Sequence, residues 1–151
     1  MYYLILIAAV ALADQAIKLF VTSHFAMMSE KAIIDGFFYI HYIPNDGIAM
    51  GLLAGKQLVV IVVTGIIMLA LACYIFMSRK KESPLTLAVL SIIVGGGIGN
   101  LIDRIRLGYV IDYLDFRVWD YIFNFADICV VVGCFALLFI ICFDTRKRKD
   151  E

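Results

Sequence analysis

Four long apolar stretches constrain the fold of this 151-residue chain more than any other feature of its sequence. They cover residues 2–21, 57–77, 85–102 and 121–143. A helix rises about 1.5 Å per residue, so about 20 residues cross a hydrocarbon layer of about 30 Å. The second and third stretches carry no charged residue, and the fourth carries only Asp127. The pattern therefore predicts four membrane-spanning helices.

The composition excludes an ordinary water-soluble domain. Hydrophobic residues make up 64% of the chain and charged residues only 17%, which is typical of an integral membrane protein. Four spans with short connections form one bundle, so we expect a single domain over residues 1–151. Ala11-Leu12-Ala13 resembles a leader cleavage site, but no Lys or Arg precedes the first stretch. The first stretch is therefore predicted to be a retained helix.

Basic clusters predict the orientation in the membrane. Residues 79–81 lie between the second and third stretches, and residues 146–149 follow the fourth. Lys and Arg next to helix ends favour the cytoplasmic side, so we expect both termini in the cytoplasm. The formal net charge of zero and the lack of a basic stripe argue against a nucleic-acid partner.

Cysteine and histidine give no metal-binding pattern. The four cysteines are Cys73, Cys129, Cys134 and Cys142, and all fall within apolar stretches without CxxC spacing. His24 and His41 lie in the first outer segment without ligand spacing. We therefore expect apolar packing for the cysteines and no metal site.

The first outer segment mixes β-branched and aromatic residues over Ala32–Ile43, around Asp35-Gly36. This pattern predicts short strands joined by a turn. Residues 44–47 (Pro-Asn-Asp-Gly) are expected to break the strand before a short apolar stretch, Ile48–Ala54. Ser83-Pro84 is typical of a helix start, so the second and third spans should form a tight hairpin.

Polar side chains from three predicted helices reach a similar depth, just below the outer surface. Asp127 lies six residues after Tyr121, roughly 9 Å below the start of its span. The converging side chains are Asp14 and Lys18 of the first span, Asn100, Asp103 and Arg104 of the third, and Asn124 and Asp127 of the fourth. Each is costly in a membrane if isolated, so together they predict a site.

Structural roles remain open for most of these groups. Asp14 and Lys18 are spaced to neutralise each other as an i,i+4 pair. Asp103 with Arg104 is placed to anchor a helix end at the lipid headgroups. Asp115 and Asp120 are expected to be solvated loop acids. Asp127 differs, because it lies inside a span with no basic residue within one turn, which favours a functional role.

A second carboxyl group beside Asp127 would allow acid–base chemistry. Two such groups share one proton, which supplies one acid and one base at neutral pH. Such a pair can activate water and protonate a leaving amine. The candidates for the partner are Asp103, Asp112 and Asp115. Asp112 is favoured over Asp115 because its apolar neighbours would press it against the membrane surface, while Asp103 stays open.

Four motifs resemble those of bacterial lipoprotein signal peptidase, also called signal peptidase II. They are "ADQAIK" (13–18), "NDGIAMG" (45–51), "GGGIGNLIDRIRLGYVIDY" (95–113) and "FNFAD" (123–127). The resemblance implies an aspartyl endopeptidase with Asp112 and Asp127 as its catalytic pair. It would remove the signal peptide from diacylglyceryl-modified prolipoproteins, cutting before the lipidated cysteine. The family usually has alanine, alanine and an aromatic residue where this chain has Ile48-Ala49-Met50. It usually has phenylalanine where this chain has Tyr113.

The resemblance also implies supporting roles. Asn100 and Asn124 would hydrogen-bond the acids or the substrate, and Asp103 and Arg104 would brace the site. Asp14 and Lys18 would support it from the first span, while Asn45 and Gly47 would help to hold the substrate. A small outer-face β-sheet and a short interfacial segment would clasp that substrate.

The expected fold is therefore an all-α integral membrane protein of four spans with this small sheet. We expect a monomer in the bacterial cytoplasmic membrane, surrounded by lipid, with its site near the outer face. Neither a metal nor an organic cofactor is needed for water attack assisted by one ionised and one protonated acid.

Two other classes compete with the enzyme. A small proton-coupled transporter or channel subunit also buries Asp and Arg, but it would need polar groups along the full depth of the bundle. The inner halves of spans two to four are almost entirely apolar, which favours a one-sided site. A structural or lipid-binding protein would give Asp127 no role.

Overall fold

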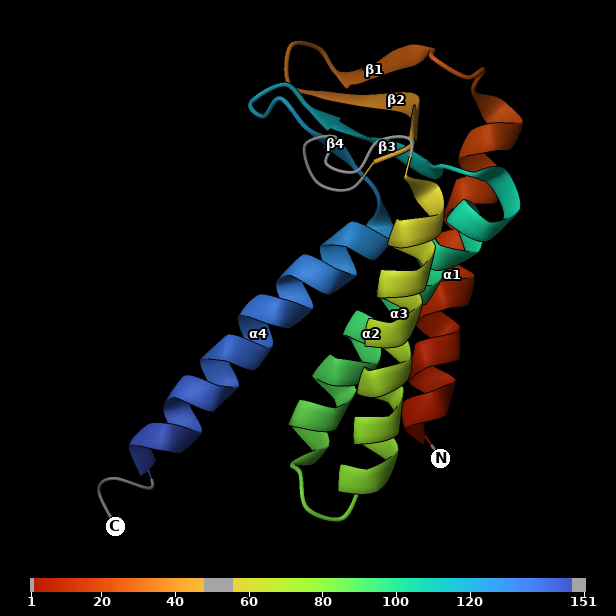
Figure 1. Ribbon diagram of the computed structural model, residues 1–151. Coiled ribbons are helices and arrows are strands. Elements are labelled where there is room, and N and C mark those ends of the chain that lie inside the picture. Colours follow the sequence, from red (N-terminus) through yellow and green to blue (C-terminus); the bar gives the residue numbers. More distant parts are fainter. Residues whose placement is uncertain (1, 48–55, 148–151) are drawn as a thin grey trace.

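A computed structural model describes residues 2–47 and 56–147 (Figure 1). Its four long helices are α1 (Tyr2–His24), α2 (Gln57–Ser78), α3 (Pro84–Leu107) and α4 (Phe125–Lys147). Each contains a window long and apolar enough to cross a membrane, which confirms the four predicted spans. The predicted apolar stretch Ile48–Ala54 and the departures at residues 48–50 lie outside the described residues.

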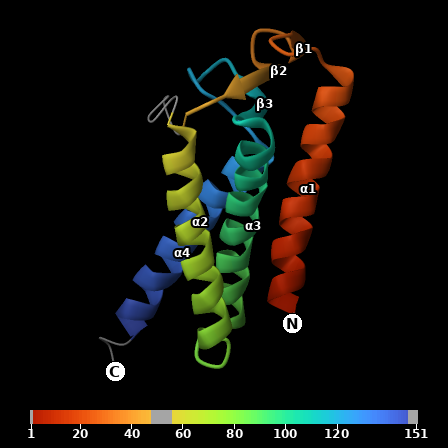
Figure 2. The same ribbon diagram turned by 45° about the vertical axis from the view of Figure 1, so that its right-hand side comes forward.

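Helix α3 is the centre of the bundle, because it packs against each of the other three helices (Figures 1 and 2). Ser83 caps its start by accepting the backbone N–H of Thr86, with Pro84 next to it, as predicted. The helix runs to Leu107 rather than ending at residue 102. Gly108 ends it in the left-handed conformation (φ 81°). Hydropathy missed this last part because it is charged.

Helix α4 begins at Phe125, not at Tyr121 as predicted. Ile122 and Phe123 form a short strand instead. The error arose because an apolar strand continuous with an apolar helix gives one uninterrupted hydrophobic run. In Figure 1, α4 diverges from the other helices toward its C-terminal end, while its first turns stay against α3.

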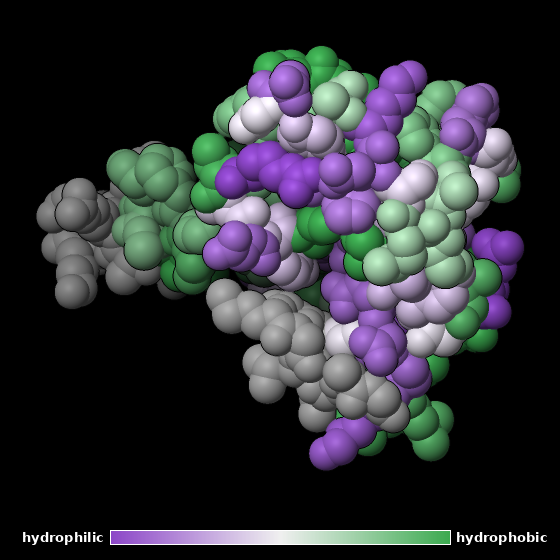
Figure 3. Space-filling view, turned by 90° about the horizontal axis from the view of Figure 1, so that it is seen from above, coloured by the Kyte–Doolittle hydropathy of each residue, from purple (hydrophilic) through white to green (hydrophobic). Residues whose placement is uncertain are grey.

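A four-stranded antiparallel sheet covers one end of the helix bundle (Figure 1). For the bundle alone, we call the end that carries the sheet the outer end and the opposite end the inner end. Its order is β1 (Glu30–Ile34), β2 (Phe38–Asn45), β3 (Val110–Phe116) and β4 (Ile122–Phe123). The predicted turn is confirmed by Gly36, whose φ of 71° suits glycine. Figure 3 looks down on this face and shows hydrophilic side chains gathered among hydrophobic ones.

Strand β2 continues through Pro44 and Asn45, where the sequence predicted a break. Pro44 pairs with Ile111 of β3, whereas the β1 pairing ends at Glu30 opposite His41. Pro44 therefore lies on a part of β2 that pairs with β3 but not with β1, where a proline, which has no N–H, costs no hydrogen bond between strands. This extension brings Asn45 beside β3.

Two buried clusters hold the layers together. Near the inner end, α1, α2 and α3 meet around Tyr3, Ile75, Leu87, Leu90 and Val94. Near the outer end, α1 packs against the sheet through Val21, Tyr42, Ile111 and Tyr113. The outer cluster fixes β3 over the bundle, and β3 carries Asp112.

Replacing Gly96 of α3 tests whether the fold depends on the close approach of α3 and α4. An added Cβ would lie 2.7 Å from the carbonyl oxygen of Ala126 in α4, and backbone cannot yield cheaply. We expect Gly96→Ala to lower the free energy of unfolding by about 1–3 kcal/mol. Gly65→Ala in α2 is the matched control, since its Cβ meets nothing within 4 Å. Thermal unfolding in detergent compares them, and equal stabilities would contradict the packing account.

Candidate active site

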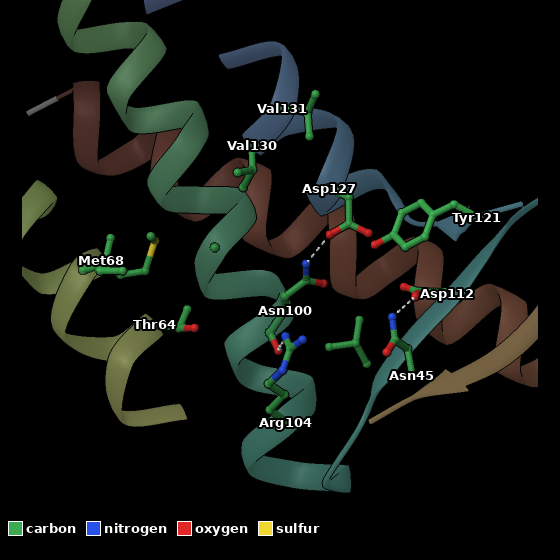
Figure 4. Close-up of a pocket in the computed structure, with 13 residues that line it drawn as sticks. Asn45, Thr64, Met68, Asn100, Arg104, Asp112, Tyr121, Asp127, Val130 and Val131 are labelled. Atoms are coloured by element: carbon green, nitrogen blue, oxygen red, sulfur yellow. Dashed lines mark hydrogen bonds between the residues drawn. The ribbon is translucent and has the colours of Figure 1, made fainter. Parts of the chain in front are cut away.

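A cavity of about 410 Å³ lies beneath the sheet, between the outer halves of α2, α3 and α4. Its polar lining residues are Asn45, Thr64, Asn100, Arg104, Asp112, Tyr121 and Asp127 (Figure 4). Met68 of α2 and Val130 and Val131 of α4 form part of an apolar wall. The cavity thus joins a polar outer part to an apolar part deeper among the helices.

Asp112 projects from β3 into this cavity and is only 2% exposed. Its Oδ2 accepts a hydrogen bond from Asn45 Nδ2 at 2.8 Å, and its Oδ1 accepts one from Asn124 Nδ2 at 2.6 Å. Burial and the charge of Asp127 raise the pKa of Asp112 to about 7, against the lowering effect of both amides. Asp112 is therefore able to hold a proton near neutral pH.

Asp127 lies in the first turn of α4 and lines the same cavity (Figure 4). Its Oδ1 accepts Asn100 Nδ2 at 2.8 Å, and its Oδ2 accepts the backbone N–H of Asn124 at 3.2 Å. Each of the two acids thus accepts two N–H donors from the protein.

Asn124 holds both acids. Its Oδ1 accepts the N–H of Asp127 at 3.0 Å while Asp127 accepts the N–H of Asn124, which forms a reciprocal capping box at the start of α4. Its Nδ2 is left to bind Asp112. Asn124 is therefore the cap before the helix, not a residue on its face as predicted. The Asn-x-x-Asp spacing was the signal that could have shown this.

Behind the cavity, α1 and α3 share a buried ionic cluster. Lys18 Nζ lies 2.9 Å from Asp14 Oδ2, 2.7 Å from Asp103 Oδ2 and 2.8 Å from Asn100 Oδ1. The predicted pair of Asp14 and Lys18 is thus present within a larger network. Asp14 Oδ1 also accepts the N–H of Ala126 at 3.1 Å, so α1 holds the first turn of α4.

Asp103 is 2% exposed, so the alternative that it anchors a helix end at the headgroups is wrong. Its Oδ2 accepts the N–H of Ile111 at 3.2 Å. It does not line the cavity of the two acids. Asp103 therefore fixes the start of β3 over the outer end of α3.

Arg104 connects α3 to the end of β2. Its Nη2 donates to the carbonyl oxygen of Gly47 at 2.8 Å, and the N–H of Gly47 donates to Asn45 Oδ1 at 3.0 Å. Within the described part of the chain, the buried Arg104 Nε has no hydrogen-bond partner. Arg104 thus ties the end of β2 to α3, and one of its donors has no partner among residues 2–47 and 56–147.

Asp115 is not the solvated loop acid that the sequence predicted. It lies in β3, is 4% exposed, and sits 3.2 Å from His41 and 3.4 Å from Arg117. Sequence spacing missed this contact because the partners come from different strands. Asp120 is exposed, as expected.

Within residues 2–47 and 56–147, Glu30, His41 and Asp115 bring potential metal-ligand atoms within 4.8 Å of one another. The sequence missed this group because its members lie on three strands. Arg117 bonds both acids of the group. Its guanidinium therefore already supplies the positive charge that a metal ion would bring.

Comparison with known proteins gives one consistent result. The sequence profile of the family described as "Signal peptidase (SPase) II" matches residues 6–143. A "Lipoprotein signal peptidase" of Halothermothrix orenii is 39% identical over 146 residues, covering 97% of this chain and 98% of that protein. One of Clostridioides difficile is 38% identical over 150 residues, covering 98% and 99%.

Solved structures agree in fold. One described as "Bacterial membrane enzyme structure by the in meso method at 2.3 A resolution" has a TM-score of 0.89 and 27% identity, covering 99% of this chain and 93% of that one. A second, with a similar title at 1.9 Å, has a TM-score of 0.82, 27% identity, and coverage of 93% and 92%.

Asn124→Ala tests whether the α4 cap also supports Asp112. Losing a helix cap costs about 1 kcal/mol, and leaving a buried acid short of a donor costs about 1.5–3 kcal/mol more. The matched control is Ser83→Ala, which removes the cap of α3 away from the cavity. Unfolding at neutral pH should show a clearly larger loss for Asn124→Ala. Equal losses would mean that Asn124 acts only as a cap.

Proposed function

The chain belongs to the signal peptidase II family, and from this premise we propose that Asp112 and Asp127 are its catalytic pair. The family makes the protein an aspartic endopeptidase that removes signal peptides from lipoproteins. The observation that carries the assignment is the shared cavity, where each carboxyl group accepts two oriented N–H donors. The resemblance of the motifs supports the same two residues in the catalytic roles.

The chemistry follows from one proton shared by two acids. The ionised member takes a proton from a water molecule as that water attacks the scissile carbonyl. The protonated member hydrogen-bonds the carbonyl oxygen, and a proton then passes to the leaving amine. The raised pKa of Asp112, caused by burial and by Asp127, supports such a shared proton. The two groups titrate as a pair.

The substrate would be a diacylglyceryl-modified prolipoprotein, cut before the lipidated cysteine. The apolar part of the cavity, between Met68 of α2 and Val130 and Val131 of α4, suits the apolar helix of a signal peptide. The polar part, with Asn45 and the unused Nε of Arg104, suits the extended peptide at the cleavage point. The substrate therefore meets both halves of the cavity.

An apolar groove separate from the cavity begins at Asp127, and its presence is consistent with a lipid-modified substrate. It is lined by Trp119, Tyr121, Phe123, Ile128, Val131 and Val132. Trp119 and Ile128 are exposed, toward the membrane in this proposal. Acyl chains attached next to the cleaved bond could leave the catalytic cavity along this groove without crossing a polar surface.

The proposed orientation places both termini in the cytoplasm and the site near the outer face of the cytoplasmic membrane. Figure 1 supports it, because the start of α1, the end of α4 and the α2–α3 turn lie at the end opposite the sheet. That turn carries Arg79, Lys80 and Lys81, as the cytoplasmic side favours. Because one chain supplies both acids, the site needs no second copy, which favours a monomer. The formal net charge of zero argues against a nucleic-acid partner.

Separate Asp112→Asn and Asp127→Asn variants test the pair. Each should lower the turnover of a lipidated precursor by about 100-fold or more, because one acid–base partner is removed. Asp120→Asn is the matched control, since Asp120 is an exposed acid just before β4. Processing is followed by mass spectrometry on folded protein. Near-wild-type turnover by either catalytic variant would disprove the assignment.

The pH dependence follows from Asp112. Its raised pKa means that it is protonated below about 7 and loses its proton above that value. If Asp112 provides the acid, kcat/KM should fall as the pH rises through about 7, since kcat/KM reports groups of the free enzyme. The measurement is kcat/KM across neutral pH. A profile that keeps rising would show that the protonated form of Asp112 is not required.

A further inference from the structure

We propose that Lys18 is a positioning residue for the reaction. Acting through the side chain of Asn100, it makes Asp127 the ionised member of the pair and leaves the shared proton on Asp112. This inference rests on the proposed function, since it assumes that the two acids form the catalytic pair. It assigns the base and the acid, which the sequence left open.

Lys18 uses all of its hydrogen-bonding capacity inside the protein. Lys18 is 1% exposed, and its ammonium contacts the side-chain oxygens of Asp14, Asp103 and Asn100 at 2.7–2.9 Å. A lysine ammonium has three donors and no acceptor. Asn100 must therefore present its oxygen to Lys18, which leaves only its NH₂ group for Asp127. The Asn100 amide cannot turn over without breaking both contacts.

The packing of α1 against α3 holds this arrangement rigid. A Cβ at Gly99 would lie 2.5 Å from Asp14 Oδ2, so the Asp14 carboxyl sits directly on the α3 backbone. Gln15 Nε2 donates to the Gly99 carbonyl at 3.1 Å and to Asp103 Oδ1 at 2.9 Å. Lys18 therefore has little freedom to leave Asn100.

Each of the two acids accepts two N–H donors, but the donors differ in whether a charged group binds them in turn. The amides that bind Asp112 belong to Asn45 and Asn124, whose oxygens accept neutral backbone N–H groups. The amide that binds Asp127 is itself bound to a cation, which strengthens its donor. Asp127 also lies in the first turn of α4, where the helix dipole favours an anion. The charge of Lys18 acts on Asp112 as well, so the difference between the two acids lies in the Asn100 amide and the helix dipole, and both of these favour ionised Asp127.

The other titratable groups around the pair do not reverse this difference. They are Asp14 of α1, Asp103 and Arg104 of α3, and the two tyrosines near the acids, Tyr113 and Tyr121. Arg104 interacts with both Asp127 and Asp112, and Asp14 and Asp103 are paired with Lys18. Burial raises the pKa of Tyr113 and raises that of Tyr121 to about 12, so both stay neutral.

The assignment gives a balanced reaction. Asp127 takes one proton from water as the water oxygen adds to the carbonyl carbon, and Asp112 gives its proton to the carbonyl oxygen. When the C–N bond breaks, Asp127 passes its proton to the amine nitrogen. Asp112 recovers a proton from the new hydroxyl, so the pair ends with one proton, as it began.

Lys18→Met in the full chain tests the inference with a lipidated precursor. Lys18 does not line the substrate cavity, so KM should stay unchanged. Turnover should fall about 100-fold, because the Asn100 amide is no longer held. The acidic limb of the kcat–pH profile should move to higher pH by about one unit, because a nearby cation is lost. Ser23→Ala is the control, because the exposed Ser23 lies on the same helix and its hydroxyl donates to the carbonyl oxygen of Leu19.

Lys18→Met leaves two buried acids, Asp14 and Asp103, without their cation and can therefore lower the stability of the fold. A second variant separates this effect from the effect on the reaction. Lys18→Met combined with Asp103→Asn removes one acid with the lysine, so it should lower turnover as well and shift the pH profile in the same direction, but by less, because an anion is lost with the cation. A fall in turnover without that shift, or a rise in KM instead, would overturn the inference. If Asp112→Asn and Asp127→Asn are inactive while both Lys18 variants behave as wild type, the catalytic pair stands and the role of Lys18 is refuted. Activity in those Asn variants would refute the pair itself.

Discussion

Burying carboxyl groups at membrane depth is the constraint on which the rest of this structure depends. An ionised acid away from water is costly unless hydrogen bonds and charges compensate it. Asp112 and Asp127 meet this constraint with amides from β2, α3 and the cap of α4. Those amides are held in turn by Lys18 and by backbone N–H groups, so the site extends well beyond its two acids.

The architecture follows from bringing these groups together. No single helix could supply donors on both sides of a cavity. The sheet therefore crosses the outer end of the bundle, where β3 delivers Asp112 and β2 delivers Asn45. Helix α3 carries Asn100 and Arg104 between its neighbours, and Gly99 lets α1 approach closely enough for Asp14 to reach α4. Over the described residues, the inner cluster around Leu87 is apolar, which fits a one-sided site better than a transport pathway.

Much of this could be predicted from the sequence because it depends on hydropathy and helix depth. The four spans, the strand pair around Gly36 and the isolation of Asp127 are local or one-dimensional signals. The choice of Asp112 over Asp103 needed the family resemblance, since both lie near the same level. The burial of Asp115 could not be predicted, because His41 and Arg117 reach it only when three strands are paired. Asn124 was misplaced because hydropathy cannot distinguish a short strand and a cap from the helix that follows.

The central claim is that Asp112 and Asp127 share one proton. The most direct test is ¹³C NMR of aspartate carboxyl groups in the full chain in micelles, with Asp112→Asn and Asp127→Asn to assign the two signals. The account predicts that Asp112 keeps its proton until the pH approaches about 7, while Asp127 is ionised, and that replacing either residue shifts the titration of the other. Two carboxyl groups that are both ionised in mildly acidic solution, and that titrate independently, would contradict it.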